Sequence, residues 1–356
     1  APAAAPAAAG AAVAKAPKLL SRSVSPPSHS ADGPPSAADG ARQVREVWAW
    51  NFEEEFAAFM LAAAQPTLGG SGAVLALDTE FPGFLIDSRK SQAPAACYQA
   101  LRQNVDSLWP IQVGVAVASS DGALRGVWSF NLRFDTAVDH HSISSVAFLR
   151  QAGIDFARHR AEGIHASELG RRLAGSALIG PFEHSPYWLT FSGLYDFGYL
   201  LKILTSGRPL PMEPAAFNNI VSMYCPNRCD LRELLPKGSL ESLGKRHGVK
   251  RSGLPHTAGS DALLTLELFF RFLQLQASAN SRSSVKTWSL EEWTGWERNR
   301  SWSSPYGWDD NWIAHRWPFT AAWQYHAAAA AASAASLSAA LSQPRNPTHS
   351  GSFFPL

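Results

Sequence analysis

The chain has 356 residues, of which 46% are hydrophobic and 17% charged, with a formal net charge of +2 at pH 7. This length suffices for one large domain or two modest ones. No apolar run approaches the length of a membrane span, so we expect no membrane partner. The small net charge does not by itself indicate nucleic-acid binding. Three cysteines, an odd and small number, argue against a disulfide scaffold and favour a reducing compartment.

Composition divides the chain into three parts. Residues 1–43 are rich in Ala, Pro and Ser and cannot bury enough apolar surface to fold, so we expect a disordered tail. Residues 44–276 alternate helix-like and strand-like segments and are predicted to form a single folded domain. Residues 277–356 carry eight of the thirteen tryptophans. We expect a disordered extension there, with a partner-binding segment as the alternative, because Trp is enriched at binding hot spots.

The elements of the central part follow from the spacing of apolar residues. A helix is predicted first, with Asn51 placed to cap it and phenylalanines at helical spacing after it. Residues 73–79 form a strand, and residues 111–119 and 125–134 form two more, joined by an Asp121-Gly122 turn. The later elements are helices around 142–151 and 167–178, a strand at 187–192, and helices at 195–205 and about 260–274. A hairpin followed by alternating elements indicates an α/β fold, a mixed sheet flanked by helices.

Two acids, Asp78 and Glu80, stand at the end of the first of these strands. Side chains two residues apart on a strand point to the same face, so these carboxylates project together while Thr79 points away. Neighbouring carboxylates repel each other unless a cation lies between them, and oxygen ligands suit divalent ions. An acidic pair of this spacing is common by chance, and a solvated strand end is the usual explanation.

Two further acids stand at the starts of helices. Asp196 lies between the strand at 187–192 and the next helix, where the helix dipole alone would also favour it. Asp261 opens the last helix, Gly259 is expected to permit a tight turn, and His256 stands just upstream, with a structural role as its alternative. If the four acids converge at one sheet edge, they suit phosphoryl hydrolysis by two metal ions about 3.5–4 Å apart. The histidine can then take a proton from water.

Five stretches of the chain then point to a family. They are VREVWAWNFEEEF, LDTEFPG, YQALRQNVD, WLTFSGLYDFGYLLKILT and HTAGSDALLT, in this order within residues 44–276. In these stretches the chain resembles the Caf/Pop-type poly(A) deadenylases of the CCR–NOT complex, which belong to the DEDD exonuclease superfamily. The resemblance implies a ribonuclease H-like fold and a metal-dependent 3′→5′ exoribonuclease that shortens poly(A) tails and releases 5′-AMP. We expect a plant homologue that acts in the nucleus and cytoplasm.

Carried over residue by residue, the resemblance implies a site for two divalent ions, Mg²⁺ or Mn²⁺. The implied ligands are Asp78, Glu80, Asp196 and Asp261. His256 is implied to position or deprotonate the attacking water. The implied partners are poly(A) RNA, a Not-type scaffold subunit and a second deadenylase subunit of the CCR–NOT complex.

Two positions depart from the family pattern. Ser192 replaces a histidine that commonly precedes the third motif, and Ala262 replaces a serine. The change at Ser192 makes weakened activity conceivable. A weakly active or inactive binding subunit of a deadenylase complex is therefore the alternative function, and an exonuclease acting on DNA is a third.

Four residues are candidates for RNA binding. Lys250 and Arg251 belong to a basic cluster upstream of His256 and are expected to attract phosphate, with a solvated helix end and loop as the alternative. Lys202, one helix after Asp196, is expected to meet a phosphate or to face water. Phe81, next to Glu80, can stack on the terminal base, with a place in the core as the alternative.

Overall fold

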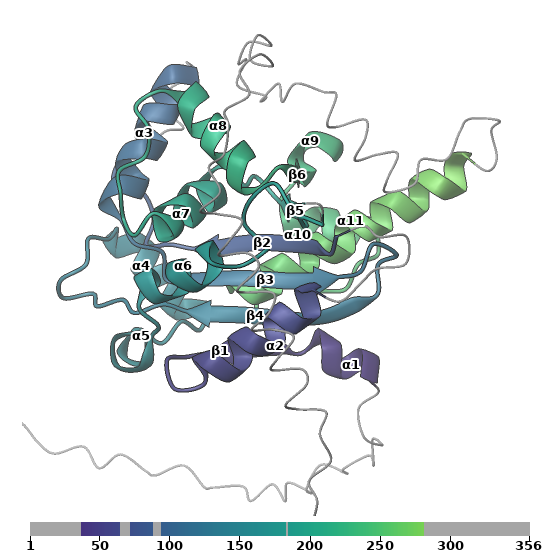
Figure 1. Cartoon of the computed structure of the whole chain (residues 1–356), viewed down its shortest axis with the longest axis horizontal. Helices are drawn as coiled ribbons and strands as arrows, with labels where there is room; N and C mark the ends of the chain where they lie inside the picture. Colours follow the sequence, from purple (N-terminus) through teal and green to yellow (C-terminus); the bar gives the residue numbers. More distant parts are fainter. Residues whose placement is uncertain (1–36, 65–71, 88–93, 183, 281–356) are drawn as a thin grey trace, which may run out of the picture. The chain divides into compact units, whose positions relative to one another are not determined.

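The computed structural model describes residues 37–64, 72–87, 94–182 and 184–280. Its strands form one six-stranded sheet, and helices cover both faces of this sheet (Figure 1). In chain order the elements are α1 (Ala37–Arg42), β1 (Val44–Val47), α2 (Phe52–Ala64), β2 (Val74–Glu80), α3 (Pro94–Ser107), β3 (Gln112–Ala118), β4 (Leu124–Asn131), α4 (Ile143–Gln151), α5 (Phe156–Glu162), α6 (Ala166–Ala174), β5 (Tyr187–Thr190), α7 (Leu194–Leu204), α8 (Pro214–Tyr224), β6 (Asn227–Asp230), α9 (Leu231–Leu234), α10 (Leu240–Arg246) and α11 (Ala258–Asn280).

The sheet is mixed, as the sequence predicted. Its strand order is β1-β4-β3-β2-β5-β6. The β2–β3 and β3–β4 pairs are antiparallel, and the β1–β4, β2–β5 and β5–β6 pairs are parallel. The turn at Asp121-Gly122 is confirmed, because the Ser119 N–H donates to the Ala123 carbonyl at 3.0 Å. Gly122 has a φ of 91°, a conformation that glycine adopts without strain.

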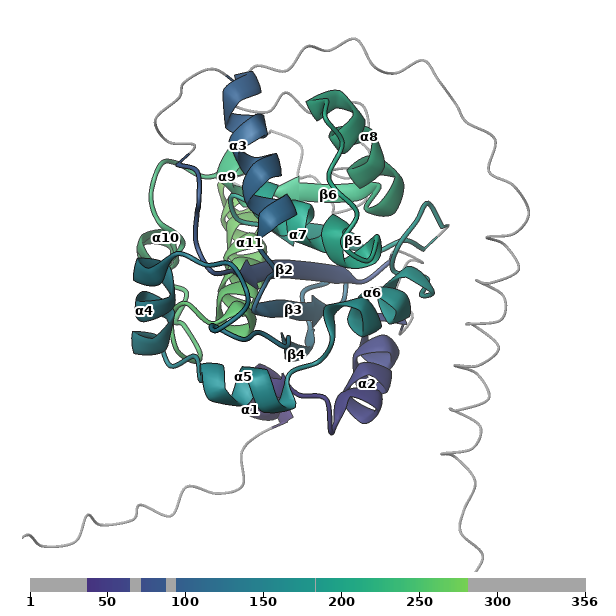
Figure 2. The same ribbon diagram turned by 90° about the vertical axis from the view of Figure 1, so that its left-hand side faces the viewer.

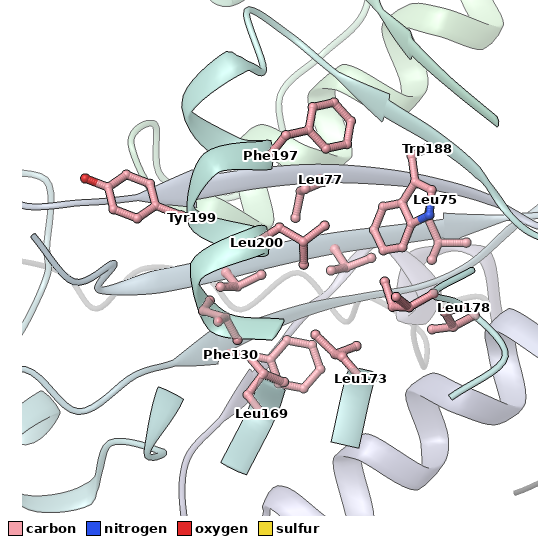
Figure 3. Close-up of a cluster of buried hydrophobic side chains, with 14 of the residues drawn as sticks. Leu75, Leu77, Phe130, Leu169, Leu173, Leu178, Trp188, Phe197, Tyr199 and Leu200 are labelled. Atoms are coloured by element: carbon pink, nitrogen blue, oxygen red, sulfur yellow. The ribbon is translucent and has the colours of Figure 1, made fainter. Parts of the chain in front are cut away.

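Alternation along β2 separates two cores. Leu75 and Leu77 pack on the face covered by α2, α3, α6 and α7, where they belong to the same buried cluster as Leu200 of α7 (Figure 3). Val74 and Ala76 pack on the opposite face, against α11. The sheet lies between two layers of helices, as the view turned by 90° shows (Figure 2). Because the same alternation continues past Leu77, the last residues of β2 also face opposite layers.

Small residues bring α11 directly onto the sheet. Gly114 of β3 is paired with Asp78 of β2, and a Cβ added to it would lie 2.0 Å from the Ala258 carbonyl carbon and oxygen. Ala116 and Ala118 continue this face of β3 toward Ala262 of the helix. Interiors are packed at near-crystalline density, so this close approach fixes where the first turn of α11 lies.

Several expectations about local structure need correction. Asn51 occupies the predicted position just before α2, where its carbonyl accepts from the Glu55 N–H at 3.0 Å. Its side chain is engaged in the turn after β1 instead, because Oδ1 accepts from the Trp48 N–H at 2.7 Å and Nδ2 donates to the Glu46 carbonyl at 3.0 Å. Gly259 lies inside α11 rather than in a turn, and its small size admits Val44, whose Cγ1 would be 2.6 Å from an added Cβ.

The described fold extends beyond the expected domain boundaries. Residues expected to belong to the disordered tail form helix α1, and Arg42 at its end forms an ion pair with Glu267 of α11 at 2.6 Å. The rest of the Ala/Pro/Ser-rich tail and the tryptophan-rich extension lie outside the described residues. Cys225 and Cys229 are buried, and neither forms a disulfide. In the described parts of the chain, no helix combines the length and apolarity needed to cross a membrane.

Candidate catalytic site

The end of β2 places two acids toward α11 and one threonine toward α7. Asp78 and Glu80 follow Val74 and Ala76 on the α11 face, and both side chains are partly exposed. Thr79 lies on the other face and is buried. It points away from its two acidic neighbours, as expected, yet it belongs to the site, because its hydroxyl donates to Asp196 Oδ1 at 2.6 Å.

Asp196 lies in the first turn of α7, where only 7% of it is exposed. A tight turn between β5 and α7 holds that helix start in place. The N–H groups of Ser192 and Gly193 donate to the Asp230 carboxylate at 2.8 and 2.7 Å. Asp230 was not among the predicted site residues. Its position at the end of β6, the strand next to β5, could have suggested a role only if that short strand had been recognised.

The start of α11 brings Asp261 and His256 to the same end of β2. One ligand atom from each of Glu80, His256 and Asp261 lies within 4.8 Å of the others, a group that could hold a metal ion. His256 is exposed and has a φ of 61°. Its ring meets the half-exposed Phe148 ring edge-on, with the centroids 4.8 Å apart, which limits where the imidazole can lie.

A chain of amides fixes the N-terminus of α11. Gln112 Oε1 accepts from the Ala258 N–H at 3.3 Å, and Gln112 Nε2 donates to Asn131 Oδ1 at 2.7 Å. Asn131 Nδ2 in turn donates to Glu46 Oε2 at 2.7 Å. This satisfies one of the helix N–H groups that have no partner within the helix. These residues were not predicted either: the sequence shows a glutamine at the start of an apolar strand but not the distant helix that it contacts.

The acids repel one another when no cation is bound. Desolvation and the charges of Asp196, Asp261 and Glu80 raise the pKa of Asp78 well above its usual value. Desolvation, then Asp261 and Asp196, raise the pKa of Glu80 to about 8. Burial also raises the pKa of Asp196 to about 7, opposed by the Thr79 hydroxyl. Such mutual repulsion among oxygen donors is typical of sites that bind divalent cations.

These pKa shifts predict that the metal-free protein loses stability as pH rises. The folded protein keeps protons on Glu80 and Asp196 up to pKa values of about 8 and 7, whereas the unfolded chain releases them near 4.5 and 3.8. Between these limits the native state binds more protons, so the free energy of unfolding falls with increasing pH. Thermal unfolding in chelator at pH 5 to 8 measures this trend. Glu80→Gln should show a shallower decline, and equal slopes in both proteins would contradict the assignment.

Two of the four expected RNA-binding residues are corrected. Lys202 neither meets phosphate nor faces water. It is 3% exposed, and its ammonium donates to the carbonyls of Val105, Asp106 and Leu108 at 2.7 to 3.0 Å, at the end of α3. Arg251 turns inward instead and contacts Glu241 and Asp261.

The other two RNA-binding candidates stay predictions. Phe81 stacks on Tyr195 with the ring centroids 5.3 Å apart and packs against the core while remaining partly exposed. Lys250 is exposed.

Ser192, one of the two positions that depart from the family pattern, has an exposed side chain and a φ of 62°. A left-handed conformation costs a non-glycine residue about 1–2 kcal/mol, while glycine loses more backbone entropy on folding. We therefore expect Ser192→Gly to raise the free energy of unfolding by up to about 1 kcal/mol. Urea denaturation measures this change, and a loss of stability would show that the serine side chain makes a contact of its own.

The protein is of the α/β class with an acidic cluster at one end of its mixed sheet, and comparisons with known proteins identify the family. The model of the CAF1 family ribonuclease matches residues 61–168. The probable CCR4-associated factor 1 homolog 10 of Arabidopsis thaliana is 35% identical over 247 residues, covering 64% of this chain and 84% of that protein. Poly(A) ribonuclease pop2 of Schizosaccharomyces pombe is 34% identical over 276 residues, covering 72% and 78%. The chain therefore belongs to the CAF1 ribonuclease family.

Solved structures agree with this assignment. The chain is similar to S. pombe Pop2p in its Mg²⁺- and Mn²⁺-bound form, with 34% identity, a TM-score of 0.58, and coverage of 68% of this chain and 93% of that one. It is also similar to a chain in the structure of the yeast NOT1 MIF4G domain co-crystallized with CAF1. The identity is 28%, the TM-score is 0.56, and the match covers 69% of this chain and 93% of that one. These relatives come from a plant and from yeasts, so the expected plant origin stays a prediction.

Proposed function

We propose that the chain is a metal-dependent 3′→5′ exoribonuclease that shortens poly(A) tails and releases 5′-AMP. The observation that carries this proposal is the convergence of acids from β2, α7 and α11 with one histidine at the end of the sheet. The match to a poly(A) ribonuclease supports the choice of substrate.

The residues present fit two divalent ions, Mg²⁺ or Mn²⁺. Asp78, Glu80, Asp196 and Asp261 would supply oxygen ligands, which both ions accept. When bound, the ions supply an activated water and stabilise the leaving oxygen. Two features support this assignment: the raised pKa values of three of these acids, and the metal-bound state of the similar Pop2p structure.

The protein's own groups have distinct tasks in this proposal. His256, exposed at the rim and held by Phe148, is the residue that accepts the proton of the attacking water. Thr79 holds Asp196 from the opposite face of β2, so that this carboxylate keeps its orientation when no RNA is bound. Fixed ligands of this kind lower the cost of organising the site during reaction.

The partners follow from the same relatives. A Not-type scaffold subunit is proposed because a CAF1 chain of similar fold was co-crystallized with the NOT1 MIF4G domain. A second deadenylase subunit is proposed from the family resemblance. Activity in the nucleus and cytoplasm is proposed in the same way, as the places where poly(A) tails are found.

The test is a gel assay of the full chain on 5′-labelled RNA ending in an adenosine tract, with Mg²⁺, with Mn²⁺ and with chelator. Stepwise, metal-dependent shortening from the 3′ end is expected, together with slower cleavage of another homopolymer. Equal cleavage of single-stranded DNA would contradict poly(A) specificity. If the folded protein shows no cleavage but gains it through Ser192→His, the chain is instead a binding subunit that has lost activity.

A further inference from the structure

Arg251 lies between two acids, Glu241 of α10 and Asp261 of the acidic site. Its Nε donates to Glu241 Oε2 at 2.7 Å, and its Nη1 donates to Ser260 Oγ at 3.0 Å and also to Asp261 Oδ1. Only 12% of its side chain is exposed. Arginine is always charged in proteins and presents its donors in a rigid fork, so this contact puts a permanent positive charge at the edge of the acidic site.

The electrostatic surroundings make this charge significant. The charge of Arg251 opposes the repulsion at Asp78, whereas Asp230 adds to the repulsion at Asp196. A carboxylate has two oxygens, and Arg251 engages Oδ1 of Asp261. One oxygen of Asp261 also lies within 4.8 Å of ligand atoms of Glu80 and His256, so the same carboxylate belongs both to the contact with Arg251 and to the candidate metal group.

We propose that Arg251 is a fixed counter-charge that stabilises the carboxylate site before metal binds and holds Asp261 in position to receive it. This role rests on the proposed function, because it assumes that divalent ions later neutralise the same carboxylates. Once they do, the contribution of Arg251 to stability becomes smaller. Arg251 is thus a positioning residue that acts through Asp261.

Glu241 anchors the guanidinium from the outer side. It accepts from Arg251 and also pairs with Lys245 at 3.1 Å, where the lysine side chain is 75% exposed. An exposed pair of this kind contributes little. Lys245 therefore offers a matched control. Replacing it removes one positive charge that pairs with Glu241, as replacing Arg251 does, but leaves the contact with Asp261 in place.

The experiment is thermal unfolding of the full chain in chelator and in saturating Mg²⁺, for wild type, Arg251→Gln, Arg251→Lys and Lys245→Gln. Glutamine keeps an N–H donor but removes the charge. We expect Arg251→Gln to lower the Tm by about 5 °C in chelator and by less than half of that with Mg²⁺. The Mg²⁺-induced rise in Tm is then larger in this variant than in wild type. Arg251→Lys, which keeps the charge, should retain most of the wild-type Tm in chelator, and Lys245→Gln should match wild type in both conditions.

Equal losses of Tm in chelator and in Mg²⁺ would overturn the proposal, because they would show a purely structural role for Arg251. Failure of Arg251→Gln to fold in either condition would overturn it in the same way, since the metal would then not replace the missing charge. A wild-type protein whose Tm does not respond to Mg²⁺ or Mn²⁺ would instead contradict metal binding and with it the proposed function.

Discussion

Asp78→Ala is expected to lower the rate of RNA shortening about a thousandfold or more while the protein remains folded. A metal ion contributes several kcal/mol of transition-state stabilisation, and each 1.36 kcal/mol is a factor of ten in rate. Asp78 is central to this loss because the charges of Glu80, Asp196 and Asp261 all act on it. The gel assay on adenosine-tailed RNA measures the effect, with single-turnover rates to separate chemistry from binding.

The same variant should be as stable as wild type or more stable in chelator. Removing Asp78 removes the carboxylate whose ionisation is opposed by burial and by the charges of Asp196, Asp261 and Glu80. With Mg²⁺ the order should reverse, because only wild type gains the full binding energy of the metal. Glu54→Ala, at an exposed acid of α2, is the control for loss of one negative charge. Near-normal turnover by Asp78→Ala would refute its assignment as a metal ligand.

The parts of the fold that sequence predicted share a strong local signal. Strands β2, β3 and β4 and helices α7 and α11 are long apolar segments, and the acids at their ends were therefore placed at the ends of elements from the start. The missed strands, β1 and β6, have only four residues each, and β6 reads NRCD. Such segments become strands because tertiary pairing with β4 and β5 completes their hydrogen bonds.

The candidate site shows the same division. The motifs pointed to its acids, but the groups that hold these acids come from distant parts of the chain. Gln112 caps α11 across 146 residues of sequence, and no local pattern announces such a contact. Lys202 was misjudged for the same reason: a lysine near a catalytic acid suggests phosphate binding, yet its acceptors are three carbonyls at the end of α3. The sequence shows that a charged side chain is present but not which groups form hydrogen bonds or ion pairs with it.

Gly114→Ala is expected to damage both stability and activity, because the sheet has no room for a methyl group at this position. The added Cβ would lie 2.0 Å from the Ala258 carbonyl and 2.5 Å from the Gly259 nitrogen. These are backbone atoms, so relief requires the first turn of α11 to move rather than a side chain to rotate. Overpacking of this kind costs about 1–3 kcal/mol, which urea denaturation can measure.

The effect on activity should exceed what the loss of stability explains. The displaced turn carries Asp261 and follows His256, and a shift of about 1 Å in catalytic groups can cost about a hundredfold in rate. We therefore expect Gly114→Ala to lower the single-turnover rate at least about tenfold at temperatures where the variant is fully folded. Gly40→Ala is the matched control, since an added Cβ there has no atom within 4 Å. A folded Gly114→Ala variant with wild-type turnover would show that the position of α11 on the sheet does not set the geometry of the acids.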